Sequence, residues 1–92
     1  MSKKIASGSK NIVLDVKFGN GAFMKTAEDA CTLAESMERI GKMCSRNIAA
    51  LITDMNTPLG NNIGNSLEVK EAVEILKSGR DCDLKRVSVA LA

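Results

Sequence analysis

The sequence lacks histidine, tryptophan and tyrosine, and Phe18 and Phe23 are its only aromatic residues. Because it has no histidine and only three widely separated cysteines, it cannot complete a Cys/His zinc site. Two phenylalanines are too few for the aromatic platform on which proteins stack nucleic-acid bases. The net charge is +2, from 13 basic and 11 acidic residues, which is too small to attract nucleic acid. We therefore predict no nucleic-acid partner.

Long apolar runs are absent as well, since no stretch approaches the roughly 18 residues of a membrane span. The N-terminal lysines are not followed by the apolar core of a signal peptide. Cys31, Cys44 and Cys82 form no CxxC pair, and their odd number favours a reducing compartment over a disulfide framework. Each is expected to act as a small buried apolar residue. These features predict a cytoplasmic protein with no membrane partner.

At 92 residues, the chain has room for one small domain with a modest core. Residues 1–6 are typical of the end of a helix, with Gly8 as its stop. Residues 12–16 and 48–53 are short apolar runs of the length of buried strands. Gly19 and Gly21 place a loop at residues 18–25, after the first of these runs.

The segment between the two apolar runs has the pattern of a helix. Thr26 followed by Asp29 resembles a capping box at a helix start. The residues expected on its apolar face are Ala30, Leu33, Ala34, Met37, Ile40, Gly41 and Cys44. Strand, helix and strand with short connections predict an α/β fold: a βαβ unit with parallel strands and a right-handed crossover.

Two more helices are expected to flank this unit. Asn65 with Glu68 marks the start of the first, and Gly79 marks its end. Its expected apolar face consists of Leu67, Ala72, Val73 and Leu76, and the second helix is indicated by Leu84, Val87 and Leu91. A chain of this size that packs only part of these faces is expected to expose apolar surface and to associate.

Ligands of parallel α/β proteins gather at the carboxyl ends of the strands, which here are the loops at 17–25 and 54–62. Gly19-Asn20-Gly21 lacks the third glycine of GxGxxG, so a glycine-supported turn is favoured over a dinucleotide site. Asp15 lies inside an apolar strand and needs a cation or hydrogen-bond donors. Asp54 is expected to cap the loop that follows it. By themselves, Lys3 and Lys4 suggest a solvated helix surface.

Four stretches in register add a family resemblance. They are residues 2–6 (SKKIA), 13–17 (VLDVK) continuing into 19–25 (GNGAFMK), 51–56 (LITDMN) with 58–60 (PLG), and 64–72 (GNSLEVKEA). In this order and spacing the chain resembles the middle of the pyrimidine-nucleoside phosphorylases, close relatives of thymidine phosphorylase. The resemblance covers nearly all of the chain but a minor part of the family's length, which predicts an internal fragment.

The resemblance implies an activity and a place in a larger fold. The family cleaves uridine or thymidine with inorganic phosphate as co-substrate, giving the free base and a pentose 1-phosphate without an organic cofactor. Residues 1–11 resemble the end of a helical-domain segment and its crossing into the large domain. Residues 12–92 resemble part of the large α/β domain. The parent is implied to be a homodimer, and the fragment is expected to be inactive alone.

The resemblance also implies site residues. Lys3 matches the family lysine that contacts the pyrimidine ring, whereas Lys4 is taken as structural. Leu59 and Asn62, through backbone carbonyls, and Glu71, through its carboxylate, match ligands of a potassium-like monovalent cation. Asn62 departs from the residue type usual at its position, which a backbone carbonyl tolerates. The glycine loop at 19–21 matches a region where the domains approach each other on closure.

Two alternatives from other classes remain open at this point. One is a small non-catalytic α/β module that binds a partner or ligand. The other is a phosphoribosyltransferase of similar fold that acts on a different base or amine, against which the Ser2-Lys3-Lys4 stretch argues. A phosphorolysis assay separates both from the nucleoside phosphorylase interpretation.

Overall fold

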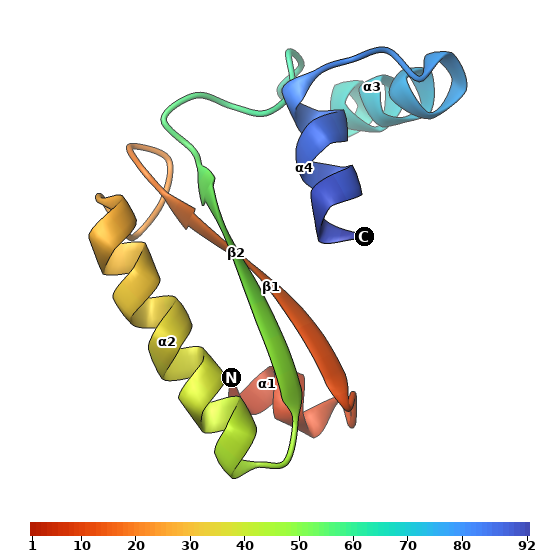
Figure 1. Ribbon diagram of the computed structural model, residues 1–92. Coiled ribbons are helices and arrows are strands. Elements are labelled where there is room, and N and C mark those ends of the chain that lie inside the picture. The colour runs from red at the N-terminus through yellow and green to blue at the C-terminus, as the bar shows by residue number, and fades with distance from the viewer. The chain divides into compact units, whose positions relative to one another are not determined.

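Four helices and two strands make up the chain, and a computed structural model describes all of residues 1–92. In chain order they are α1 (Ser2–Ala6), β1 (Asn11–Phe18), α2 (Ala27–Met43), β2 (Asn47–Asp54), α3 (Asn65–Ser78) and α4 (Asp83–Leu91) (Figure 1). They divide into two compact units, Met1–Asn56 and Thr57–Ala92. The first unit contains α1, both strands and α2, and the second contains α3 and α4.

The first unit is the predicted βαβ unit. β1 and β2 pair in parallel along their whole length, from Asn11 opposite Asn47 to Phe18 opposite Asp54. The helix α2 connects them and runs along the strand pair, so both strands end at the edge where the loop between β1 and α2 lies (Figure 1). The predicted α/β class with parallel strands and flanking helices is confirmed.

The core lies between α2 and one face of the strands. Leu14 and Val16 of β1 are buried against Ala30 and Ala34 of α2. Alternation along the strand explains this arrangement, because residues two apart point to the same face. Burial of small alanines allows the helix to approach the strands closely, but no large side chain is fully buried. The core is therefore as modest as the chain length predicts.

Helix α2 begins as the sequence predicts. Thr26 is its N-cap, and the Thr26 hydroxyl accepts a hydrogen bond of 3.2 Å from the backbone N–H of Asp29. Of the predicted apolar face, Ala30, Ala34 and Gly41 are buried. Ile40 is 42% exposed, because it lies at the edge of the face that meets the strands.

Gly41 allows the close contact between α2 and β2. A Cβ atom added at Gly41 would overlap the Ile48 Cδ1 atom. We expect Gly41→Ala to lower the free energy of unfolding by about 1–3 kcal/mol through overpacking, despite the higher helix propensity of alanine. Urea denaturation of the chain followed by circular dichroism measures this change. Adding Ile48→Val removes Cδ1, the nearer of the two overlapping Ile48 atoms, so the double variant should lose less; a Gly41→Ala chain as stable as the original would contradict the prediction.

The predicted burial of the cysteines is wrong for two of the three. Cys31 and Cys44 are exposed, Cys82 is intermediate, and all three are free thiols. Cys31 directly follows the buried Ala30, and one helical residue turns the side chain by about 100° away from the core. Cys44 lies at the C-cap of α2, beyond the part of the helix that the strands cover.

In the second unit, the predicted start of α3 is wrong by one residue. Gly64 is the N-cap, with φ of 120°, and Asn65 is already helical. The Gly64 carbonyl accepts the backbone N–H of Glu68 at 2.8 Å, so the backbone closes the first turn without a side-chain cap. The predicted stop is confirmed, because Gly79 ends α3 in the left-handed region, with φ of 64°.

The predicted apolar face of α3 is not buried within its unit. Leu67, Val73 and Leu76 are 47%, 43% and 84% exposed, whereas Glu71 is the buried residue of this helix. The expectation of exposed apolar surface is therefore confirmed. None of the helices combines the length and the apolarity that crossing a membrane requires.

Candidate functional site

A cavity of about 640 Å³ opens beside β1 in the first unit. Its apolar wall comes from Phe23 and Met24 of the loop after β1 and from Leu33 and Met37 of α2, and its polar groups come from Lys4, Asp15 and Lys17. This volume lies within the range of small-molecule sites, which combine an apolar lining with a few placed polar groups. The cavity runs along β1 as far as the loop that follows the carboxyl end of this strand, the region where α/β proteins bind ligands.

Asp15, Lys17 and Thr53 form a closed polar cluster on this part of the sheet. The Lys17 ammonium donates to Asp15 Oδ2 at 2.8 Å and to Thr53 Oγ1 at 3.0 Å. The Thr53 hydroxyl in turn donates to Asp15 Oδ1 at 2.5 Å. Because Asp15 and Lys17 are two apart in β1, they share a face, and Lys17 is opposite Thr53 in the register. The predicted pairing of Asp15 is confirmed.

The environment of Asp15 keeps it ionised. Burial by itself raises the pKa of Asp15, but the hydrogen bonds from Lys17 and Thr53 and the charge of Lys17 outweigh it, so the pKa lies below its ordinary value. The contribution of Asp15 to stability is consequently present above its unfolded-state pKa and is lost as the pH falls through the lower folded-state pKa. At neutral pH the cluster contains one positive and one negative charge.

The loop between β1 and α2 is fastened to the end of β2. Gly21 donates its backbone N–H to the Met55 carbonyl at 3.0 Å, and Asn20 donates its own to Asn56 Oδ1 at 3.1 Å. A Cβ atom at Gly19 would lie 2.6 Å from Asn56 Oδ1, and its φ of 113° also favours glycine. Because these N–H groups already have partners, the loop is a glycine-supported turn rather than a phosphate cradle.

Two further predictions concern Asp54 at the end of β2 and the two lysines of α1. Asp54 caps the loop after β2, because its Oδ1 accepts the backbone N–H of Asn56 at 2.7 Å. In α1, Lys3 and Lys4 are both exposed, and Lys4 but not Lys3 lines the cavity. The structure thus brings to the cavity the lysine that was expected to be structural, and the predicted contact of Lys3 with a pyrimidine stays a prediction.

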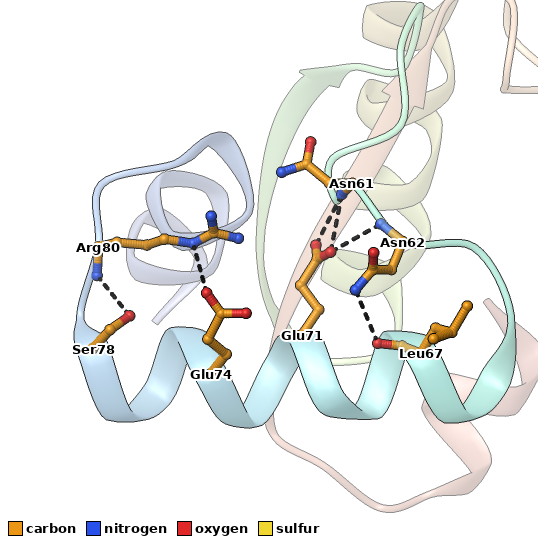
Figure 2. A network of polar contacts seen from close by, with 7 residues as sticks. All are labelled: Asn61, Asn62, Leu67, Glu71, Glu74, Ser78 and Arg80. Atoms are coloured by element: carbon orange, nitrogen blue, oxygen red, sulfur yellow. Dashed lines mark hydrogen bonds and ion pairs between the residues drawn. The ribbon is translucent and has the colours of Figure 1, made fainter.

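In the second unit, Glu71 organises the loop that precedes α3 (Figure 2). Glu71 is 5% exposed as a residue, and its carboxylate accepts the backbone N–H of Asn61 at 3.0 and 3.1 Å and that of Asn62 at 2.9 Å. Asn62 Nδ2 also donates to the Leu67 carbonyl at 3.4 Å. A Cβ atom at Gly60 would overlap Glu71 Oε1, so glycine is needed where the loop crosses the carboxylate.

Two of the three predicted cation ligands, Asn62 and Glu71, are in direct contact, and Leu59 lies in the same loop. Glu71 forms no ion pair, so backbone N–H groups alone stabilise a buried negative charge. Such a charge is suited to a nearby monovalent cation. No cluster of three or more His, Cys, Asp or Glu side chains occurs in the chain, so a cation here would depend on backbone oxygens as well. The residues fit this group.

Sequence reasoning did not find the roles of Lys17, Thr53 and Asn61. The spacing of Asp15 and Lys17 was a usable signal, because opposite charges two apart on a strand lie on one face. Nothing in the local sequence marks Thr53 or the backbone of Asn61. Asp15, the partner of Thr53, is 38 residues away, and Glu71, the partner of the Asn61 N–H, is 10 residues away.

Comparison with known proteins agrees with the family resemblance of the four stretches. No family model matches the sequence. The chain is 56% identical over 91 residues, 99% of its length, to the pyrimidine-nucleoside phosphorylase of Staphylococcus epidermidis (strain ATCC 12228 / FDA PCI 1200). It has the same identity and coverage with that of Staphylococcus aureus (strain USA300). The chain spans 21% of the length of these relatives. The predicted resemblance and the predicted fragment are both confirmed.

Proposed function

Because the chain corresponds over 99% of its length to a segment of the pyrimidine-nucleoside phosphorylases, we propose that it is part of such an enzyme. The reaction proposed is phosphorolysis of uridine or thymidine, which gives the free base and a pentose 1-phosphate. The identity of 56% over 91 residues carries this proposal. A segment of 21% of the relatives' length cannot orient two substrates, so the chain alone is expected to be inactive.

The chemistry of the reaction suits the residues proposed to bind the base. When the glycosidic bond breaks, the leaving pyrimidine gathers negative charge on its ring carbonyls. An ammonium group held beside it interacts more strongly with the transition state than with the nucleoside, which accelerates the step. Lys3 is the residue proposed for this role, on its match to the family stretch at residues 2–6.

A potassium-like ion is proposed at the loop before α3. The supporting observation is the buried carboxylate of Glu71, which has no cationic side-chain partner. The carbonyls of Leu59 and Asn62 would supply further hard oxygen ligands. The proposed role of the ion is to fix the loop, and no step of the reaction passes through it.

The remaining features of the parent are proposals of the same kind. Residues 1–11 are proposed to end a helical-domain segment and to cross into the large α/β domain, of which residues 12–92 are a part. The exposed apolar side chains of α3 are consistent with packing inside a larger protein. A homodimeric, cytoplasmic parent without an organic cofactor completes the proposal.

A chimeric enzyme tests the proposed function. In it, this chain replaces the segment that it matches in the S. epidermidis phosphorylase, and every other residue is kept. We expect ultraviolet assays to show release of uracil from uridine and of thymine from thymidine only when phosphate is present. The chain alone should release neither base. A chimera that folds but releases no base from either nucleoside would contradict the proposal and favour one of the two alternatives, because neither a non-catalytic module nor a phosphoribosyltransferase, which needs a 5′-phosphorylated pentose, cleaves these nucleosides.

A further inference from the structure

The Asp15–Lys17–Thr53 cluster leaves one strong hydrogen-bond donor unused. A lysine ammonium has three N–H groups. Two of them are directed to Asp15 Oδ2 and Thr53 Oγ1, and no acceptor within the chain takes the third. The Thr53 hydroxyl donates its only hydrogen to Asp15 Oδ1. The spare donor of the cluster is therefore the third N–H of Lys17.

The Lys17 ammonium is held by two contacts, and Lys17 lines the cavity. The Lys17 side chain is 28% exposed and that of Asp15 is 25% exposed, while Thr53 is buried at 8%. Asp15 and Lys17 are among the residues that line the cavity, as are Phe23 and Leu33. Two fixed contacts on a flexible lysine remove much of the side-chain entropy that a ligand would otherwise have to overcome.

The charge of the cluster indicates which ligand atom this donor suits. Asp15 neutralises Lys17 at a distance of 2.8 Å, so an approaching anion meets the carboxylate as well as the ammonium. A phosphate dianion is therefore poorly matched to this position, whereas a neutral oxygen acceptor is well matched. A nucleoside offers such oxygens in its pentose hydroxyls and base carbonyls, and the apolar cavity wall suits its flat base.

We propose that Lys17 binds the nucleoside by donating a hydrogen bond to one of its neutral oxygens, and that Asp15 and Thr53 position the Lys17 ammonium for this contact. The inference rests on the proposed function, because it takes the nucleoside as the ligand of the cavity. It adds a binding residue and two positioning residues on the sheet to the lysine of the N-terminal stretch. On this proposal, inorganic phosphate binds outside the cluster.

Calorimetry of uridine binding to the chimeric enzyme, in the absence of phosphate, tests the contact separately from turnover. Lys17→Met keeps the length and apolar stem of the side chain but removes the donor, so the Kd for uridine should rise about tenfold. The KM for phosphate should stay unchanged. Lys10→Met, at an exposed lysine outside the cavity, is the matched control and should bind uridine as the unaltered enzyme does.

Asp15→Asn distinguishes a neutral ligand oxygen from an anion. The substitution leaves the cluster with a net positive charge and a less constrained Lys17. Uridine binding should weaken by about threefold, because the ammonium loses its positioning partner, and phosphate affinity should not rise. Tighter phosphate binding together with unchanged uridine binding would instead assign Lys17 to the phosphate and would overturn the proposal.

Chemical labelling of the unaltered chimera needs no variant that might fail to fold. Reductive methylation of lysines, with and without uridine, is measured by mass spectrometry. Uridine is expected to protect Lys17 severalfold and to leave Lys10 unaffected. Equal labelling of Lys17, or a Lys17→Met enzyme that binds uridine normally, would overturn the inference even with phosphorolysis intact. Uridine binding that depends on Lys17 without any phosphorolysis would support the inference and reject the proposed reaction.

Discussion

Replacing Lys3 with alanine in the chimeric enzyme is expected to lower kcat/KM for uridine by about 10²–10³-fold, the usual effect of removing one charge-stabilising donor. The reason is the negative charge that the pyrimidine acquires as it leaves the pentose. Most of the loss should appear in kcat, because the ammonium interacts more strongly with the charged leaving group than with the neutral nucleoside. Steady-state rates of base release at saturating phosphate measure both constants.

The leaving group provides a sharper form of the same test. A 5-fluoro substituent withdraws electrons from the ring and stabilises the departing base without help from the protein. The loss caused by Lys3→Ala should therefore be smaller for 5-fluorouridine than for uridine. An equal loss with both nucleosides would show that Lys3 orients the substrate or supports the fold, and that it does not stabilise the leaving group.

Lys4→Ala is the comparison that decides between the two neighbouring lysines. Both lysines of α1 are exposed and only Lys4 lines the cavity, yet the family match assigns the base contact to Lys3. If the match holds in the full-length enzyme, Lys4→Ala should retain most of the activity that Lys3→Ala loses. The reverse order of effects would transfer the base contact to Lys4.

Glu71→Ala is expected to destabilise the loop before α3 more than any other single substitution in the second unit. It removes the acceptor of the backbone N–H groups of Asn61 and Asn62, and each unsatisfied group costs about 1–3 kcal/mol. It also leaves a cavity beside Gly60. Hydrogen exchange in the chimeric enzyme should show the amides of Asn61 and Asn62 exchanging at least tenfold faster, which corresponds to about 1.4 kcal/mol.

Glu71→Gln separates the loop contacts from the proposed cation. Glutamine keeps one carbonyl oxygen that accepts N–H groups, so protection of Asn61 and Asn62 should largely survive. The negative charge is lost, so any stabilisation of the chimera by potassium over a large organic cation such as tetramethylammonium should disappear. Potassium stabilisation that persists in Glu71→Gln would reject Glu71 as a cation ligand while leaving its role in the loop intact.

Local sequence patterns were sufficient to predict the helices and strands and their order along the chain. Apolar runs at 12–16 and 48–53 predicted β1 and β2, and the hydroxyl of Thr26 and the flexibility of Gly79 predicted a start and a stop. These features depend on residues a few positions apart, which is the range over which side-chain periodicity and backbone capping act. The parallel pairing followed as well, because a helix between two strands returns the chain to the same edge of the sheet.

The sequence by itself thus determined the α/β class, the βαβ unit, the family resemblance and the need of Asp15 for a partner. Only the tertiary structure decided that this partner is Lys17 with Thr53, 38 residues from Asp15, and that Glu71 holds the backbone of Asn61 and Asn62. It also decided that Cys31 is exposed and that Lys4 reaches the cavity. The reason is that strand register and helix orientation, set by packing across the whole unit, determine which distant groups come within hydrogen-bond distance.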